Sequence, residues 1–113
     1  MMNNELQTVK IMLEFLQGPI WFSDVETGEP ITGISVIDTD PIVKDLNYRC
    51  AELFNSYYEF DSHNEACWFN SEKQKADKEI MLELITQLIS RLNEINDGSF
   101  VIEDLESARL KQL

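Results

Sequence analysis

The sequence is poor in basic residues. It contains 9 lysine and arginine residues against 21 aspartate and glutamate residues, which gives a formal net charge of -12 at pH 7. Proteins bind nucleic acid by neutralising its phosphates with lysine and arginine, so this balance excludes nucleic acid as a direct ligand. Anionic membrane surfaces are disfavoured for the same reason. The charge instead favours cationic partners, which are basic proteins or metal ions.

Cysteine is also scarce, and long apolar segments are missing. The two cysteines, Cys50 and Cys67, are too few for a disulfide scaffold. The first residues lack the basic and apolar regions of a signal peptide. No apolar run approaches the roughly eighteen residues that indicate a membrane-spanning helix. We therefore expect a cytoplasmic protein with reduced thiols and no membrane contact.

Motifs that indicate catalysis are absent from the sequence. There is one histidine, His63, and there is no glycine-rich phosphate loop, nucleophile elbow or set of zinc ligands. Cys50 lies in an apolar stripe, so we expect a small buried side chain there and not a nucleophile. Two carboxylates could act as acid and base, but the sequence cannot place a pair in one cleft. We predict that the protein is not an enzyme and has no cofactor.

One group of residues partly matches a calcium-binding loop. Asp61, His63 and Glu65 occupy alternate positions, and Glu72 follows Asp61 by eleven residues. A twelve-residue calcium loop between two helices has this spacing. However, Ala66 replaces the glycine of the sharp turn, and the third position supplies a histidine nitrogen, whereas calcium prefers oxygen. We therefore predict no metal site, and a metal-responsive helical module remains an alternative.

Apolar side chains recur at helical spacing through much of the chain, whose 113 residues match the length of one domain. Asp40 followed by Pro41 is typical of a helix start, and Ser71 with Gln74 resembles a capping box. The fold class that we predict is mainly α: a three- to four-helix bundle that forms a single domain over residues 1–113. The predicted helices cover residues 4–17, 41–60, 72–96 and 103–112, and the longest lies within 72–96.

Residues 19–40 form an irregular or hairpin-like insert between the first two predicted helices. Residues 24–30 have turn chemistry, and many of residues 31–37 are β-branched. The periodicity is too short to distinguish a small hairpin from an ordered loop. Either structure must pack on the helices, because an isolated hairpin is only marginally stable.

Residues 57–69 combine aromatic and acidic side chains. Five of these thirteen residues are aromatic, and no lysine or arginine lies between Cys50 and Glu72. Tyrosine and tryptophan often dominate protein interfaces, and carboxylates attract cationic partners, although aromatic residues are also common in cores. A second stretch without basic residues runs from Ile11 to Val43. The partner-binding residues that we predict from the two stretches are Tyr58, Glu59, Asp61, His63, Glu65, Trp68, Asp24, Glu26 and Glu29.

In size, charge and acidic-aromatic surface candidates, the chain resembles bacterial toxin-immunity proteins, including those of contact-dependent inhibition and colicin-type systems. These are typically small acidic proteins, and the nuclease toxins that they inhibit are typically cationic around the active site. The resemblance implies a protein that covers the active or nucleic-acid-binding site of a basic toxin. Two further alternatives are a phage-type inhibitor that mimics nucleic acid and an oligomerisation scaffold that uses the apolar seam from Met81 to Ile95.

Overall fold

The computed structural model describes residues 6–14, 18–24, 26–62 and 64–113, and for Asp61, Ser62 and Glu65 it describes the backbone only. The described part mixes helices with short strands, so the predicted mainly α helical bundle is wrong. Its strands form two separate two-stranded sheets, β1 with β4 and β2 with β3. In chain order the elements are β1 (Gln7–Ile11), α1 (Ser35–Asp38), α2 (Pro41–Asn55), β2 (Tyr58–Ser62), β3 (Glu65–Phe69), α3 (Ser71–Ala76), α4 (Lys78–Ile95), β4 (Phe100–Asp104) and α5 (Ser107–Lys111).

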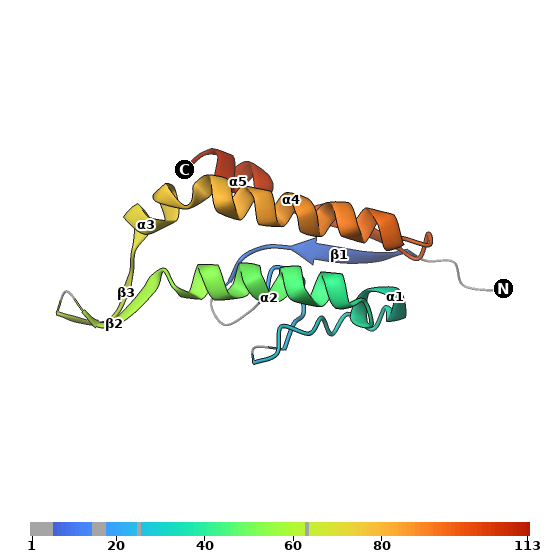
Figure 1. Ribbon diagram of the computed structural model, residues 1–113, viewed down its shortest axis with the longest axis horizontal. Coiled ribbons are helices and arrows are strands. Elements are labelled where there is room, and N and C mark those ends of the chain that lie inside the picture. The colour runs from blue at the N-terminus through green and yellow to red at the C-terminus, as the bar shows by residue number, and fades with distance from the viewer. Residues whose placement is uncertain (1–5, 15–17, 25, 63) are drawn as a thin grey trace.

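Helices α2 and α4 lie side by side, run in opposite directions and supply much of the core (Figure 1). Helix α2 starts as predicted, with Pro41 first and the Asp40 carboxylate accepting a hydrogen bond from the Val43 N–H. Helix α4 is the longest described helix and lies within residues 72–96, which confirms that prediction. The two helices bury Val43, Leu46, Cys50 and Phe54 from α2 and Met81, Ile85, Leu88 and Leu92 from α4.

The predicted third helix is divided at Asp77. This residue has φ -92° and ψ 5°, so α3 ends before it and α4 begins after it. The predicted capping box at Ser71 is wrong, because the Asn70 side-chain oxygen accepts the hydrogen bond from the Lys73 N–H at 3.0 Å. Asparagine caps a helix as well as serine does, so the cap can lie one residue earlier.

The predicted first helix is also wrong, because its described part contains strand β1. Val9 and Ile11 are buried, whereas Lys10 between them is only partly buried and Thr8 before them is exposed, which is the alternation of a strand. Such a short apolar segment fits the period of a helix and the period of a strand equally well. The segment forms a strand because a partner strand lies beside it. That partner is β4, which pairs in parallel from Gln7 opposite Phe100 to Ile11 opposite Asp104. Residues 4–5 and 15–17 of the predicted helix lie outside the described residues.

Strand β4 also shortens the last predicted helix. Residues 103 and 104 belong to the strand, and α5 begins only at Ser107. The Asp104 carboxylate accepts hydrogen bonds from the N–H groups of Glu106 and Ser107 at 3.0 and 2.9 Å. These bonds support the turn from strand to helix, and they hold the pKa of Asp104 below its usual value against the opposing effect of burial.

The insert between β1 and α2 is a hairpin-like turn followed by a short helix. Ser23 bridges Pro30 in antiparallel fashion, and the Ile31 N–H donates to the Phe22 carbonyl at 2.8 Å. Ile20 forms a second bridge to Ile11, so the insert lies along the free side of β1. The hairpin that was one of the two predicted alternatives is therefore present in the described residues 20–24 and 26–31. Helix α1 (Ser35–Asp38) occupies part of the β-branched segment that follows.

The corner after α2 is a second hairpin. The predicted helix over residues 41–60 ends at Asn55, and β2 pairs with β3 from Tyr58 opposite Phe69 to Ser62 opposite Glu65. This hairpin projects beyond the ends of α2 and α4 (Figure 1), and the molecule measures 58 × 26 × 22 Å. A calcium loop between two helices is incompatible with this backbone, because β3 separates Asp61 from Glu72.

None of the described helices combines the length and the apolar character that crossing a lipid bilayer requires.

Candidate protein-binding surface

The β2–β3 hairpin is attached to the core by aromatic rings. The Phe54 ring lies 6.0 Å from the Tyr57 ring and 5.8 Å from the Tyr58 ring, and both contacts are T-shaped. Phe69 contacts all three rings, at 4.9 to 6.1 Å between centroids. Burial raises the pKa of the Tyr57 hydroxyl, and the Asp77 carboxylate adds to this effect. Tyr58, predicted as a binding residue, therefore belongs largely to the root of the hairpin.

The outer part of the hairpin carries the other candidates. Glu59 lies opposite Trp68, which is half-buried, and the Glu59 carboxylate accepts a hydrogen bond from the Asn70 amide at 2.8 Å. Phe60 is 59% exposed, which makes it the most exposed described aromatic residue of the hairpin. His63 lies outside the described residues, as do the side chains of Asp61 and Glu65.

The other three candidates lie in the turn over residues 24–29. The Asp24 carboxylate accepts hydrogen bonds from the N–H groups of Thr27 and Glu26, both at 2.9 Å, and these bonds lower the pKa of Asp24. Glu29 forms an ion pair with Lys44 of α2 at 3.1 Å. The carboxylate of Glu26 is exposed, and in the described part of the chain neither Asp24 nor Glu26 forms an ion pair.

A buried asparagine holds this turn on α2. The Asn47 side-chain oxygen accepts a hydrogen bond from the Ile20 N–H at 3.0 Å. Its amide nitrogen donates to the Ser23 hydroxyl and to the Gly28 carbonyl, both at 2.9 Å. Sequence reasoning missed Asn47, although a signal was present: it stands among buried apolar positions of α2, four residues after Val43 and three before Cys50.

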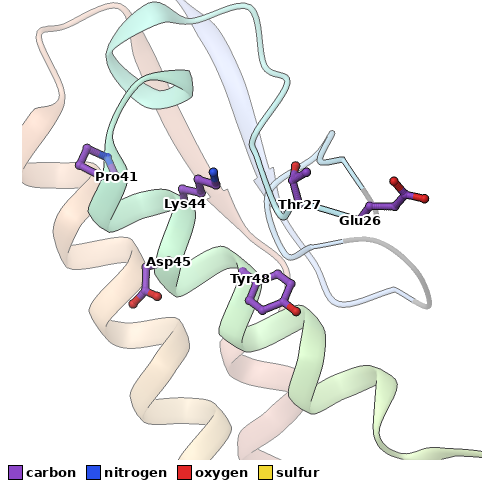
Figure 2. Close-up of a pocket in the computed structure, with 6 residues that line it drawn as sticks. All are labelled: Glu26, Thr27, Pro41, Lys44, Asp45 and Tyr48. Carbon is purple, nitrogen blue, oxygen red and sulfur yellow. The ribbon is translucent and has the colours of Figure 1, made fainter.

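Between the turn and α2 lies an open cavity of about 420 Å³ (Figure 2). Lys44 and Tyr48 face the turn from the helix, and Thr27 and Glu26 border the cavity on the other side. The turn packs closely against α2 at Gly28. Its φ is +75°, and an added Cβ would lie 2.6 Å from the Tyr48 Cβ. The cavity thus exposes the Tyr48 ring and the Lys44 amine toward the turn, whereas the Glu26 carboxylate points away from the helix. Its lining residues are Glu26, Thr27, Pro41, Lys44, Asp45 and Tyr48.

Two exposed apolar side chains flank the same turn, and neither was among the predicted binding residues. Phe22 is 64% exposed and Ile31 is 59% exposed, and a main-chain hydrogen bond joins the two residues. The Trp21 ring lies 5.6 Å from the Phe22 ring. We call Phe22, Asp24, Glu26 and Ile31 the turn surface. Its acidic residues were predicted to bind a partner. Ile31 was not, because it lies in a β-branched segment whose exposure the sequence does not show.

The structure does not join the two groups of candidates into one site. The turn contacts α2 near Lys44, whereas the hairpin follows Asn55 at the end of the helix. Eleven residues of helix separate these points, which corresponds to about 16 Å at 1.5 Å per residue. The predicted surface is therefore two surfaces, and the turn surface is the better described.

A buried carboxylate, Glu106, also escaped sequence reasoning. It is fully buried, accepts a hydrogen bond from the Leu13 N–H at 2.8 Å and contacts the Arg109 guanidinium at 2.6 Å. Burial raises the pKa of Glu106, although both contacts oppose this rise. Glu106 therefore ties α5 to the segment that follows β1. Within the described residues, no group of three histidine, cysteine or acidic side chains is arranged to hold a metal ion.

Comparison with known proteins found no matching family model, no matching curated protein and no matching solved structure.

Proposed function

We propose that this chain is a small acidic binding protein of the cytoplasm that neutralises a cationic protein partner. In this proposal it acts as toxin-immunity proteins do, by covering the active or nucleic-acid-binding site of a basic toxin, and it is neither an enzyme nor a carrier of a cofactor. The observation that supports it best is the turn surface. There, exposed Phe22 and Ile31 flank the carboxylates of Asp24 and Glu26, which form no ion pair with any described residue. Apolar anchors surrounded by charge are typical of protein interfaces.

The distribution of charge supports the same function. At least five of the 9 basic residues are engaged in ion pairs with particular acidic side chains of the chain, so these bases are not free to neutralise the remaining carboxylates. The excess negative charge remains available to attract a cationic partner and to accelerate its association. The engaged bases are Lys44, Arg49, Lys73, Arg91 and Arg109.

The alternative of an oligomerisation scaffold required the apolar seam of α4 to be accessible to a second copy. Met81, Ile85, Leu88 and Leu92 of the apolar seam are all buried in the single chain. A second copy could reach them only if α4 left its own core, which would expose much of the apolar surface that stabilises the fold.

The test is purification from the native cell together with the product of the neighbouring gene. We expect a basic protein in a one-to-one complex whose association slows as salt rises, because the Debye length falls to about 8 Å at physiological ionic strength. Ile31→Ala should increase the dissociation rate, and Glu26→Gln should mainly slow association. The matched controls are Ile80→Ala and Glu79→Gln at exposed positions of α4, where Ile80 is 56% exposed. Recovery of acidic partners alone, or binding that is indifferent to salt, would refute the proposal.

A further inference from the structure

Strand β4 is an edge strand whose outer side carries no partner strand in the described part of the chain. Its neighbour β1 is covered on the other side, because the Met12 N–H donates to the Pro19 carbonyl at 2.9 Å and the Trp21 N–H to the Lys10 carbonyl at 3.1 Å. The sheet therefore has one protected edge and one open edge. An open edge is a template for pairing with another chain.

The hydrogen bonds to β1 show which groups of β4 face outward. The Gln7 N–H donates to the Ser99 carbonyl, and the Leu105 N–H donates to the Ile11 carbonyl. In a parallel ladder this places the main-chain groups of alternate residues 99 to 105 toward β1. Those of Ile102 and Asp104 then point to the open edge, where the described residues supply no main-chain partner for them.

The side chains around this edge are apolar and acidic. Val101 and Leu105 are exposed, and Glu103 between them is exposed and forms no ion pair with the described residues. No lysine or arginine occurs between Arg91 and Arg109, whereas that stretch contains five acidic residues. An incoming strand would thus meet two apolar side chains and the exposed carboxylate of Glu103.

Charge decides between the two occupants that such an edge could take. Pairing β4 with a second copy would bring two acidic strands, and two chains with a net charge of -12 each, into contact without any base between them. An extended segment with alternating basic and apolar residues would instead place its bases on one face of the sheet, beside Glu103.

We infer that the outer edge of β4 binds an extended basic segment of a partner protein as a third strand of the sheet. Main-chain hydrogen bonds to Ile102 and Asp104 would provide the affinity, and Val101, Glu103 and Leu105 would select apolar and basic side chains. This inference rests on the proposed function only in taking the partner to be basic. The turn surface would then be a separate contact, because it lies on the insert beyond the other side of β1.

The experiment titrates the full chain with the acetylated and amidated peptide Thr-Val-Lys-Val-Arg while amide hydrogen exchange is followed residue by residue. We expect the amides of Ile102 and Asp104 to exchange about tenfold more slowly at saturation, because they gain hydrogen-bond partners. A peptide with glutamate in place of lysine and arginine is the matched control and should give no protection. Equal protection by both peptides, or protection by neither, would overturn the inference.

Two variants separate edge pairing from general attraction. Ile102→Pro removes an outward N–H while leaving the bonds to β1, and proline is tolerated on an edge strand, so this variant should fold without binding the peptide. Glu103→Lys should weaken peptide binding about tenfold more than Glu79→Lys on α4 does, because only Glu103 lies on the edge. Equal weakening by both charge reversals would show that only net charge matters, which contradicts the inference.

The same variants distinguish this inference from the proposed function. A native basic partner that binds Ile102→Pro as tightly as the original chain would refute edge pairing and leave the proposed function intact. If the peptide protects Ile102 but no native basic partner is found, edge pairing is supported and the proposed function is refuted. A wild-type dimer that Ile102→Pro abolishes would show that a second copy occupies the edge, which also overturns the inference.

Discussion

The two ends of helix α2 hold their neighbouring segments by different kinds of contact. Near its start, polar groups dominate: Asp40 forms an ion pair with Arg91 at 2.6 Å, and Asn47 holds the turn by three hydrogen bonds. Near its end, rings dominate, because Phe54 contacts Tyr57 and Phe69. Polar contacts depend on complete pairing and on pH, whereas ring contacts depend on area and shape.

This difference bears on how the two candidate surfaces respond to mutation. The turn surface is held by a few specific bonds, so one substitution can displace it while the core persists. The hairpin root is part of the core, so substitutions there act on the whole fold. Four measurements test this contrast.

The largest effect is expected at the aromatic end. Phe54→Ala should lower the free energy of unfolding by about 3 to 5 kcal/mol, because it removes a buried ring that contacts three others. Urea unfolding measures the loss. Phe60→Ala is the control, since Phe60 is exposed on the same hairpin, and it should cost less than about 0.5 kcal/mol. Equal costs for the two variants would show that the root is not packed as described.

A smaller and more local effect is expected at the polar end. Asn47→Ala should cost about 1 to 3 kcal/mol, because it leaves the buried Ile20 N–H and Gly28 carbonyl without their partner. Trp21 fluorescence should change, since Trp21 lies in the segment that Asn47 holds. Asn93→Ala on the exposed side of α4 serves as the control and should leave both stability and fluorescence unchanged. Unchanged fluorescence together with unchanged stability in Asn47→Ala would contradict the anchoring role.

Close contact at the turn can be separated from backbone strain by two glycines. Gly28 and Gly33 have φ values of +75° and +81°, so alanine at either position should cost about 1 to 2 kcal/mol of strain. Only Gly28→Ala adds a collision, with Tyr48, whereas an added Cβ at Gly33 meets nothing within 4 Å. Thermal unfolding should therefore show the greater loss for Gly28→Ala. If the losses are equal, the turn does not rest against α2.

The smallest effect concerns pH. The Arg91 hydrogen bond lowers the pKa of Asp40 below its unfolded value of about 3.9. Because the folded-state pKa is the lower one, the contribution is complete above the unfolded value and is lost as pH falls through the folded-state pKa. Asp40→Asn keeps a capping side chain, so it should be less stable at pH 7 and lose less stability on acidification.

Asp45→Asn is the matched control for this pH measurement. Asp45 pairs with Arg49 on the surface, where both side chains are more than half exposed. Such a pair contributes about 0 to 1 kcal/mol, so the variant should follow the pH dependence of the original chain. Parallel pH curves for the original chain and Asp40→Asn would refute the role of the Asp40–Arg91 pair.

Sequence patterns predicted best where the segment was long and locally consistent. The apolar face within residues 72–96 extends over several turns, and Asp40 with Pro41 is a strong start signal, so the core helices were found. Cys50 is buried as expected, and burial raises the pKa of its thiol to about 12. Short segments failed: residues 7–11 and 58–62 fit helix and strand equally well, and each became a strand because a partner strand lay beside it.

The sequence by itself therefore determined the net charge, the long amphipathic helices and the acidic turn, because each follows from composition or from neighbours along the chain. Only the tertiary structure decided that β1 pairs with β4, that Asn47 holds the insert and that Phe22 and Ile31 are exposed. These features depend on residues far apart in sequence: 93 positions separate Gln7 from its partner Phe100. A single sequence carries no local record of such pairings, because the energy that selects them arises only when the distant segments meet.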